Sequence, residues 1–221
     1  RIRSFVLRQG RITPAQQRAF DAHWLRYGLD YTGTPRDFAA SFGRAAPLIM
    51  EIGFGNGGQL LHSAQTAANA NFIGIEVHRP GVGRLMNGLA EANVDNTRIS
   101  NHDAVEVIER QLAPESLDEV RIYFPDPWPK QRQHKRRLIR PEFVGLATSR
   151  LVSGGTLHCA TDWRNYADQM LEVLESEPGL RNNYDEFAPR PDWRPVTRFE
   201  RKGLSADHEI KDLIFTKLDV T

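Results

Sequence analysis

The chain has 221 residues, which is short for two domains and enough for one domain with a sizeable core. Its one cysteine, Cys159, cannot form an internal disulfide, and no stretch approaches the length of about 18 apolar residues that a membrane-spanning helix needs. The amino end lacks the apolar stretch of a secretory signal, so membrane, secreted and fibrous proteins are excluded and a cytoplasmic protein is expected. The sequence starts at Arg1 without Met, and we expect the native start to lie upstream.

The net charge of +1 is the sum of regions with opposite signs. Residues 1–44 carry a net +5, residues 45–129 carry −6, residues 130–140 carry +6 and residues 141–221 carry −4. A basic segment can bind a polyanion locally even when the whole chain is nearly neutral. Nucleic acid therefore stays among the expected partners.

Short apolar runs alternate with helix-like stretches, which predicts an α/β fold with a mostly parallel sheet. We expect residues 1–44 to be a basic N-terminal arm that can be partly mobile, and residues 45–221 to be the folded domain. The expected strands are residues 47–53, 71–77, 97–103, 117–124, 155–162 and, as an antiparallel edge strand, 213–218. The expected helices are residues 59–68, the stretch that ends near 92, 104–112, 141–150 (closed by Gly154 and Gly155) and a stretch from 163, before a loop over 178–202.

A glycine-rich turn, GFGNGG at residues 53–58, joins the first expected strand to the first expected helix. Glycine permits positive φ and lets a ligand approach the backbone closely. The spacing of Gly53, Gly55 and Gly58 also satisfies a dinucleotide-binding pattern, with Glu76 as its acidic ribose partner. The turn predicts a nucleotide-type ligand and leaves open which one, and a tight turn needed only for packing is the alternative.

Three acidic residues surround the expected cleft. Glu51 lies within the first strand, Glu76 ends the second and Asp103 ends the third. Three carboxylates would repel a pyrophosphate, whereas S-adenosylmethionine carries a cationic amino group, a sulfonium and several hydroxyl and amine donors. We therefore expect S-adenosylmethionine rather than a dinucleotide, although each acid taken singly can be a solvated strand end.

The most specific segment is IYFPDPWPK at residues 122–130. Its three alternating prolines fix φ and restrict each preceding residue, so the loop is expected to be stiff. Stiffness of this kind places a carboxylate, here Asp126, before the substrate arrives. A plain rigid turn is the alternative.

Taken together, these segments resemble the bacterial single-chain tRNA (guanine-N7-)-methyltransferases. The resemblance runs in order over residues 1–218, through MEIGFGNGG, IGIEVH, NHDA, YFPDPWPK with HKRRL, the Thr161-Asp162 pair and VTRFERKG. It implies a single-domain class I, Rossmann-like S-adenosylmethionine-dependent methyltransferase with a seven-stranded sheet, helices on both faces and an antiparallel strand near the C-terminus. It also implies methyl transfer to N7 of a guanine in the variable loop of tRNA, with S-adenosylhomocysteine as product.

The resemblance further implies roles for individual residues. The implied cofactor contacts are Glu51, Gly53, Gly55, Gly57, Glu76, Asp103, Ala104 and Asp126. Asp126 also corresponds to the residue assigned to catalysis. The implied guanine-binding residues are Lys130, Asp162, Thr197, Arg198, Phe199 and Glu200. The implied RNA-backbone contacts are Arg132, Gln133, His134, Lys135, Arg136 and Arg137.

Guanine N7 has an in-plane lone pair and no proton, so no activating base is expected. The seven histidines show no metal-ligand spacing, His158 and Cys159 are expected simply to be buried in a strand, and no metal is expected. We expect no membrane contact and no obligate protein partner, in a monomer or homodimer. Three alternatives stay open: an NAD-dependent oxidoreductase, a non-catalytic RNA-binding module and a methyltransferase for exocyclic amino groups. The basic run could also be a solvated helix face.

Overall fold

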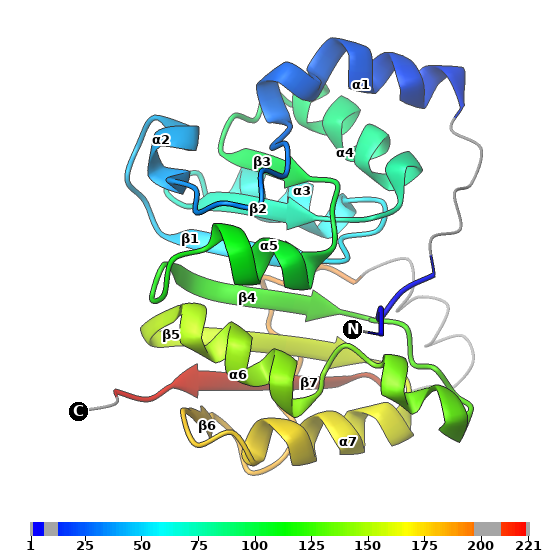
Figure 1. Cartoon of the computed structure of the whole chain (residues 1–221), viewed down its shortest axis with the longest axis vertical. Helices are drawn as coiled ribbons and strands as arrows, with labels where there is room; N and C mark the ends of the chain where they lie inside the picture. The colour runs from blue at the N-terminus through cyan, green and yellow to red at the C-terminus, as the bar shows by residue number, and fades with distance from the viewer. Residues whose placement is uncertain (1, 7–12, 197–208, 220–221) are drawn as a thin grey trace.

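The computed structural model describes residues 2–6, 13–196 and 209–219. In this described part, seven strands form one sheet in the order β3-β2-β1-β4-β5-β7-β6 (Figure 1). The strands are β1 Leu48–Ile52, β2 Asn71–Ile75, β3 Thr97–Ser100, β4 Leu117–Tyr123, β5 Leu151–Thr161, β6 Leu180–Asn182 and β7 Lys211–Lys217. Strands β1 to β5 are parallel, and β7 runs antiparallel to β5 and β6. The expected fold class is confirmed.

Helices cover both faces of the sheet. The described helices are α1 Pro14–Tyr27, α2 Phe38–Phe42, α3 Gly58–Thr66, α4 Arg79–Glu91, α5 Ala104–Gln111, η1 Gln131–Arg136 (a 3-10 helix), α6 Pro141–Arg150 and α7 Arg164–Glu175. Residues of α2, α5, α6 and α7 share one hydrophobic core with the sheet, and residues of α1, α3 and α4 share the other. No helix in the described part is long and apolar enough to cross a membrane.

The order of the strands places the cleft. From β1 the chain moves outward through β2 and β3, and it then returns to β4 on the other side of β1. Connections leaving β1 and β4 therefore diverge, and ligands of open α/β sheets bind in the crevice at this point, outside the carboxyl ends of the strands. The glycine-rich turn follows β1 here, and the proline-rich loop follows β4.

The described residues before 45 pack against the domain rather than standing apart from it. Thr13 and Gln16 form a reciprocal capping box at the start of α1, and Pro14 occupies its first turn. Tyr27, at the end of α1, is fully buried, and Gly28 forms an isolated β-bridge with Ile99 on the edge strand β3. The border at residue 45 therefore does not coincide with a break in packing.

Two expected local features differ from the structure. Gly154 and Gly155 do not close α6, because β5 begins at Leu151 and the pairing of β4 with β5 shifts between Leu117 and Glu119. Gly154 has φ +76°, which suits an irregularity within a strand. The expected loop over residues 178–202 contains the short strand β6.

Candidate active site

A cavity of about 430 Å³ opens at the carboxyl ends of β1, β2, β3 and β4. Five of the expected cofactor residues line it: Gly53, Glu76, Asp103, Ala104 and Asp126. The walls also include Ser4, Phe5 and Val6 from the amino end, which lies beside the tip of β4 (Figure 1). No motif in the sequence marked these three residues as part of the site.

Glu76 joins the second strand to the glycine-rich turn. Its carboxylate accepts hydrogen bonds from the backbone N–H groups of Gly55 and His78, each at 2.9 Å. Burial raises the pKa of Glu76 above its ordinary value, and these backbone hydrogen bonds act in the opposite direction. A carboxylate has about four acceptor positions, so Glu76 keeps acceptor capacity for a hydroxyl group of a ligand in the cavity.

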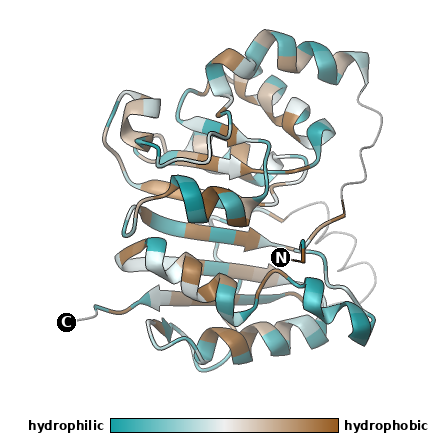
Figure 2. Cartoon of the chain, in the orientation of Figure 1, coloured by the Kyte–Doolittle hydropathy of each residue, from teal (hydrophilic) through white to brown (hydrophobic). Residues whose placement is uncertain are grey.

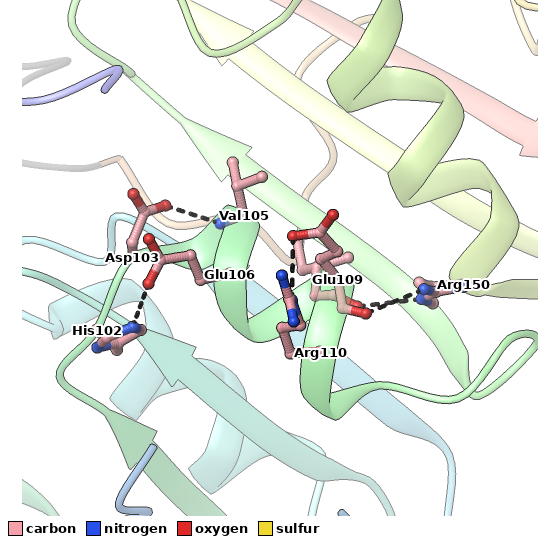
Figure 3. Close-up of polar contacts among 8 residues, drawn as sticks. His102, Asp103, Val105, Glu106, Glu109, Arg110 and Arg150 are labelled. Atoms are coloured by element: carbon pink, nitrogen blue, oxygen red, sulfur yellow. Dashed lines mark hydrogen bonds and ion pairs between the residues drawn. The ribbon is translucent and has the colours of Figure 1, made fainter. Parts of the chain in front are cut away.

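Asp103 caps α5 at the mouth of the cavity. Its carboxylate accepts a hydrogen bond from the backbone N–H of Val105 at 3.0 Å (Figure 3). The neighbouring His102 pairs instead with Glu106 at 2.6 Å, and its ring stacks on Tyr31. The cap fixes the direction of the Asp103 carboxylate, and Ala104 leaves the helix start open because its side chain is small.

The glycine-rich turn lies in close contact with α4. Gly53, Gly55 and Gly57 have φ values of +72°, +57° and +76°, which a residue with a Cβ atom rarely adopts. A Cβ atom placed on Gly81 of α4 would lie 2.0 Å from the carbonyl oxygen of Gly55. Helix α4 can therefore approach the turn this closely only because residue 81 is also glycine.

Glu51 lies below the turn and does not line the cavity. It is 2% exposed, and it faces Arg121 in the register of β1 and β4. Burial raises its pKa to about 7, the positive charge of Arg121 lowers it and the negative charge of Glu119 raises it. Among the described residues, its Oε2 atom has no hydrogen-bond partner. A buried acceptor of this kind suits a cationic ligand group.

The proline-rich loop is fixed at several points. The N–H of Phe124 donates to the carbonyl of Ala160 at 2.7 Å, and the indole N–H of Trp128 donates to the carbonyl of Ser4 at 3.0 Å. Phe124 and Trp128 both have positive φ, of 51° and 46°, which is uncommon outside glycine and clusters at functional sites. Asp126 lies between them and is exposed at the rim of the cavity. The expected stiffness therefore has a structural basis.

The basic segment, residues 130–140, begins with the short helix η1. Lys130, Arg132 and Lys135 are exposed, and Gln133 and His134 are half-buried. The half-buried Arg136 has its guanidinium 5.1 Å from the centre of the Trp128 ring. This face is available to an RNA backbone directly after the proline-rich loop.

Arg137 departs from the expected phosphate-contacting role. It is 2% exposed, and its guanidinium donates to the carbonyl of Pro127 and to the side chains of Gln169 and Asn165. The same group lies over the ring of Tyr166 at 4.7 Å. Its hydrogen bonds are directed inward, so Arg137 anchors the proline-rich loop to α7 and is removed from the set that can reach a phosphate.

The expected guanine-binding residues are only partly described. Lys130 is exposed at the start of η1, and Asp162 is half-buried just after β5. Thr197, Arg198, Phe199 and Glu200 lie outside the described residues. Within the described ranges, no three His, Cys, Asp or Glu side chains are grouped so that they could hold a metal ion.

The cavity fits S-adenosylmethionine. Two buried carboxylates, those of Glu76 and Asp103, offer acceptors for hydroxyl and amine groups, and Gly53 of the glycine-rich turn lines the cavity beside them. Solved structures with the same fold include the 16S rRNA methyltransferase KamB, with a TM-score of 0.62 and 13% identity over 82% of this chain and 93% of that chain. A S-adenosylmethionine-dependent O-methyltransferase from Thermotoga maritima gives a TM-score of 0.53 and 16% identity over 83% and 64%.

A family model described as "Putative methyltransferase" matches residues 45–213. The fold and the cleft thus define a class I S-adenosylmethionine-dependent methyltransferase. The tRNA (guanine-N(7)-)-methyltransferase of Xanthomonas axonopodis pv. citri (strain 306) is 56% identical over 218 residues, covering 98% of this chain and 84% of the relative. That of Paraburkholderia xenovorans (strain LB400) is 54% identical over 217 residues, with coverage of 98% and 84%. The chain belongs to the tRNA (guanine-N(7)-)-methyltransferase family.

Gly81→Ala tests the contact between α4 and the turn. Because the added Cβ would meet the Gly55 carbonyl, we expect S-adenosylmethionine affinity to fall at least tenfold and the melting temperature to drop. The control is Gly145→Ala in α6, where the nearest atom to a new Cβ is the end of the Glu177 side chain at 3.4 Å. Calorimetric titration and thermal unfolding measure both effects. Unchanged affinity in Gly81→Ala would show that the turn tolerates displacement.

Proposed function

We propose that this protein transfers the methyl group of S-adenosylmethionine to N7 of a guanine in the variable loop of tRNA. The observation that carries the proposal is the position of Asp126. It stands at the rim of the cofactor cavity, on a stiff loop, four residues before the exposed basic segment that starts at Lys130. The family of the chain supports the same reaction and substrate. We further propose that the enzyme works in the cytoplasm as a monomer or homodimer.

The reaction requires little acid–base catalysis by the protein. The bound cofactor supplies an electrophilic methyl group on a sulfonium, and guanine N7 is nucleophilic without loss of a proton. The chain has to hold the two reactants in line, and orientation of this kind can lower a barrier by roughly 7–11 kcal/mol in favourable cases. Gly53, Glu76 and Asp103 are positioned to hold the donor side, because they line the cavity on adjacent strand ends.

The acceptor side depends on the proline-rich loop and its surroundings. During transfer, positive charge develops on the purine, and a fixed carboxylate at Asp126 or Glu200 can stabilise it by accepting from guanine N–H groups. Lys130 can donate to the guanine O6 oxygen. N7 lies in the deep and narrow major groove of an RNA helix, so the target base is expected in a loop or extruded from its stack.

Asp126→Ala tests the proposed catalytic role. We expect the rate of methyl transfer to tRNA to fall about 10²–10³-fold, because a preorganised charge is lost where charge develops. S-Adenosylmethionine binding should stay measurable, since Glu76 and Asp103 remain. Asp95→Ala is the control, because Asp95 pairs with Arg26 just before β3 begins, away from the carboxyl ends of the strands. Chromatography of the released nucleosides against a 7-methylguanosine standard measures the rate of N7 methylation; near-normal turnover would refute the role.

Glu51 gives a prediction for pH. The pKa of this residue is raised to about 7, so the proportion of ionised Glu51 increases as pH rises through 7. If the ionised form pairs with the cationic amino group of the cofactor, S-adenosylmethionine affinity should increase over this range, by at most about tenfold per unit below 7. Glu51→Gln should bind more weakly at pH 8 and lose this added dependence. Calorimetry at pH 6, 7 and 8 compares the two proteins, and identical pH profiles would contradict the pairing.

The exposed part of the basic segment should control the salt dependence of tRNA binding. Replacing Arg132 and Lys135 together by Ala should make the slope of log K against log salt shallower by about 1.4–1.8, if each contacts one phosphate. Arg110→Ala is the control, because Arg110 is also exposed but lies at the far end of α5. Filter binding of tRNA at several salt concentrations measures the slopes, and equal slopes in all three proteins would contradict the assignment.

A further inference from the structure

Trp163 stands at the start of α7, where its side chain does not support the helix. It is the N-cap residue, and its side chain makes no capping hydrogen bond. Small polar residues are preferred at this position, because a side-chain oxygen there accepts a hydrogen bond from a backbone N–H of the first turn. Indole has a donor and no acceptor, so it cannot act in this way. A tryptophan at residue 163 therefore gives up the stability that a capping residue would provide.

The ring of Trp163 also differs in its contacts from the other tryptophans of the chain, which number three. Each of these has an aromatic ring or a guanidinium over its own ring: Trp24 has Phe20, Trp128 has Arg136 and Trp193 has Arg121. No contact of this kind involves Trp163 in the described part of the chain, and 36% of the residue is exposed. The indole face of Trp163 is therefore available to a planar ligand.

The register of the sheet places Trp163 at the same edge as the loop that carries Asp126. Strands β4 and β5 are parallel neighbours, and Tyr123 at the end of β4 is aligned with Ala160 on β5. The segments that follow these two residues therefore leave the sheet side by side, at its carboxyl edge (Figure 1). Asp126 stands three residues after Tyr123, and Trp163 stands three residues after Ala160.

A single side chain ties the start of α7 to the proline-rich loop. The guanidinium of Arg137 donates to the carbonyl of Pro127 at 3.0 Å and to Oδ1 of Asn165 at 2.7 Å. Pro127 directly follows Asp126, and Asn165 lies two residues after Trp163, in the first turn of α7. Since both hydrogen bonds come from one planar group, the start of α7 lies against the loop.

The proposed reaction changes the charge of the target base. The N7 lone pair forms the bond to the methyl carbon while the carbon–sulfur bond breaks and its electron pair stays on sulfur, so one positive charge passes to the purine. The face of an indole ring attracts a cation placed over it. Proteins also hold unstacked RNA bases by stacking them on aromatic side chains. One indole face therefore suits the neutral guanine and suits the methylated, cationic guanine better.

We propose that the indole ring of Trp163 stacks on the target guanine and stabilises the positive charge that develops on the purine. This rests on the proposed function, because it takes guanine as the base that enters the site beside Asp126. Trp163 is outside the set of described residues that line the cofactor cavity, so its role belongs to the acceptor side. It acts on the face of the base, whereas Asp126 and Lys130 act on its edge.

The first test compares Trp163→Leu with Trp163→Phe. Leucine keeps apolar bulk without an aromatic face, whereas phenylalanine keeps a smaller aromatic face. We expect the single-turnover rate of N7 methylation at saturating enzyme to fall about tenfold or more in Trp163→Leu, and by no more than about threefold in Trp163→Phe. Calorimetric titration should give S-adenosylmethionine affinities within about threefold of wild type for both. A wild-type rate in Trp163→Leu, or equal rates in the two variants, would overturn the role.

The second test measures binding without methyl transfer. The probes are a tRNA that carries 7-methylguanosine in its variable loop and the same tRNA without this methyl group, in filter binding at slightly acidic pH, where the methylated base keeps its charge. We expect the wild-type protein to prefer the methylated tRNA by about threefold or more, and Trp163→Leu to lose this preference. Absence of the preference in the wild-type protein, or an equal preference in the variant, would contradict the stacking.

Trp163→Ser separates the proposed role from folding. Serine is a preferred N-cap residue, so the melting temperature should stay within about 4 °C of wild type while the methylation rate falls as in Trp163→Leu. This variant decides the matter if Trp163→Leu does not fold. The matched control is Tyr184→Ser, which removes another exposed aromatic side chain, in the segment after β6, and should keep the wild-type rate. An equal loss of rate in Tyr184→Ser would overturn the inference.

Failure of the proposed function would give a different result from failure of the stacking role. If the proposed function is wrong, the wild-type enzyme forms no 7-methylguanosine in tRNA. If only the stacking role is wrong, the wild-type enzyme forms 7-methylguanosine and Trp163→Ser forms it at the same rate.

Discussion

The cleft depends on the close contact between the glycine-rich turn and the start of α4. Glu76 ties the two together, because its carboxylate binds the N–H of Gly55 in the turn and the N–H of His78, which caps α4. Gly81 then allows the helix to lie against the Gly55 carbonyl. Since Glu76 also lines the cavity, the same carboxylate shapes the turn and offers acceptor atoms to a bound ligand. Substitution of Glu76 would change both the shape of the turn and the acceptor atoms in the cavity, whereas substitution of Gly81 changes only the contact between the turn and α4.

All described strands except β6, and both functional loops, were accessible from the sequence because their signals are local. Apolar runs, the glycine turn and the alternating prolines each act on their own few residues. Helix α1 was not predicted, although Thr13, Pro14 and Gln16 carry the residues of a capped helix start, because α1 is mostly hydrophilic (Figure 2). Its fit to the domain depends on Tyr27 meeting α4 and β3, which no local pattern reveals.

Residue roles that depend on distant partners could not be predicted in the same way. A run of six cations does not show which side chain points into the protein. Arg137 points inward because Asn165 and Gln169 on α7 accept hydrogen bonds from its guanidinium. His158 was expected to be simply buried, and it is, but its partner Asp212 lies 54 residues further along the chain. The acidic excess of residues 45–129 is likewise not all directed at the cofactor, because Glu119 pairs with the buried Arg121.

Methyl transfer to an atom that carries no proton requires the protein mainly to hold the two reactants in position. The proline-rich loop, which carries Asp126, is restrained at several points. The proline-rich loop is restricted by its own prolines, and three hydrogen bonds hold it: Phe124 N–H to the Ala160 carbonyl, Trp128 indole N–H to the Ser4 carbonyl, and Arg137 to the Pro127 carbonyl. Each restraint acts on a different residue of the loop, so together they fix both the direction of the loop and its position relative to the end of β4. A further restraint acts where the loop leaves β4, because the buried guanidinium of Arg194 lies over the rings of Tyr123 and Phe124.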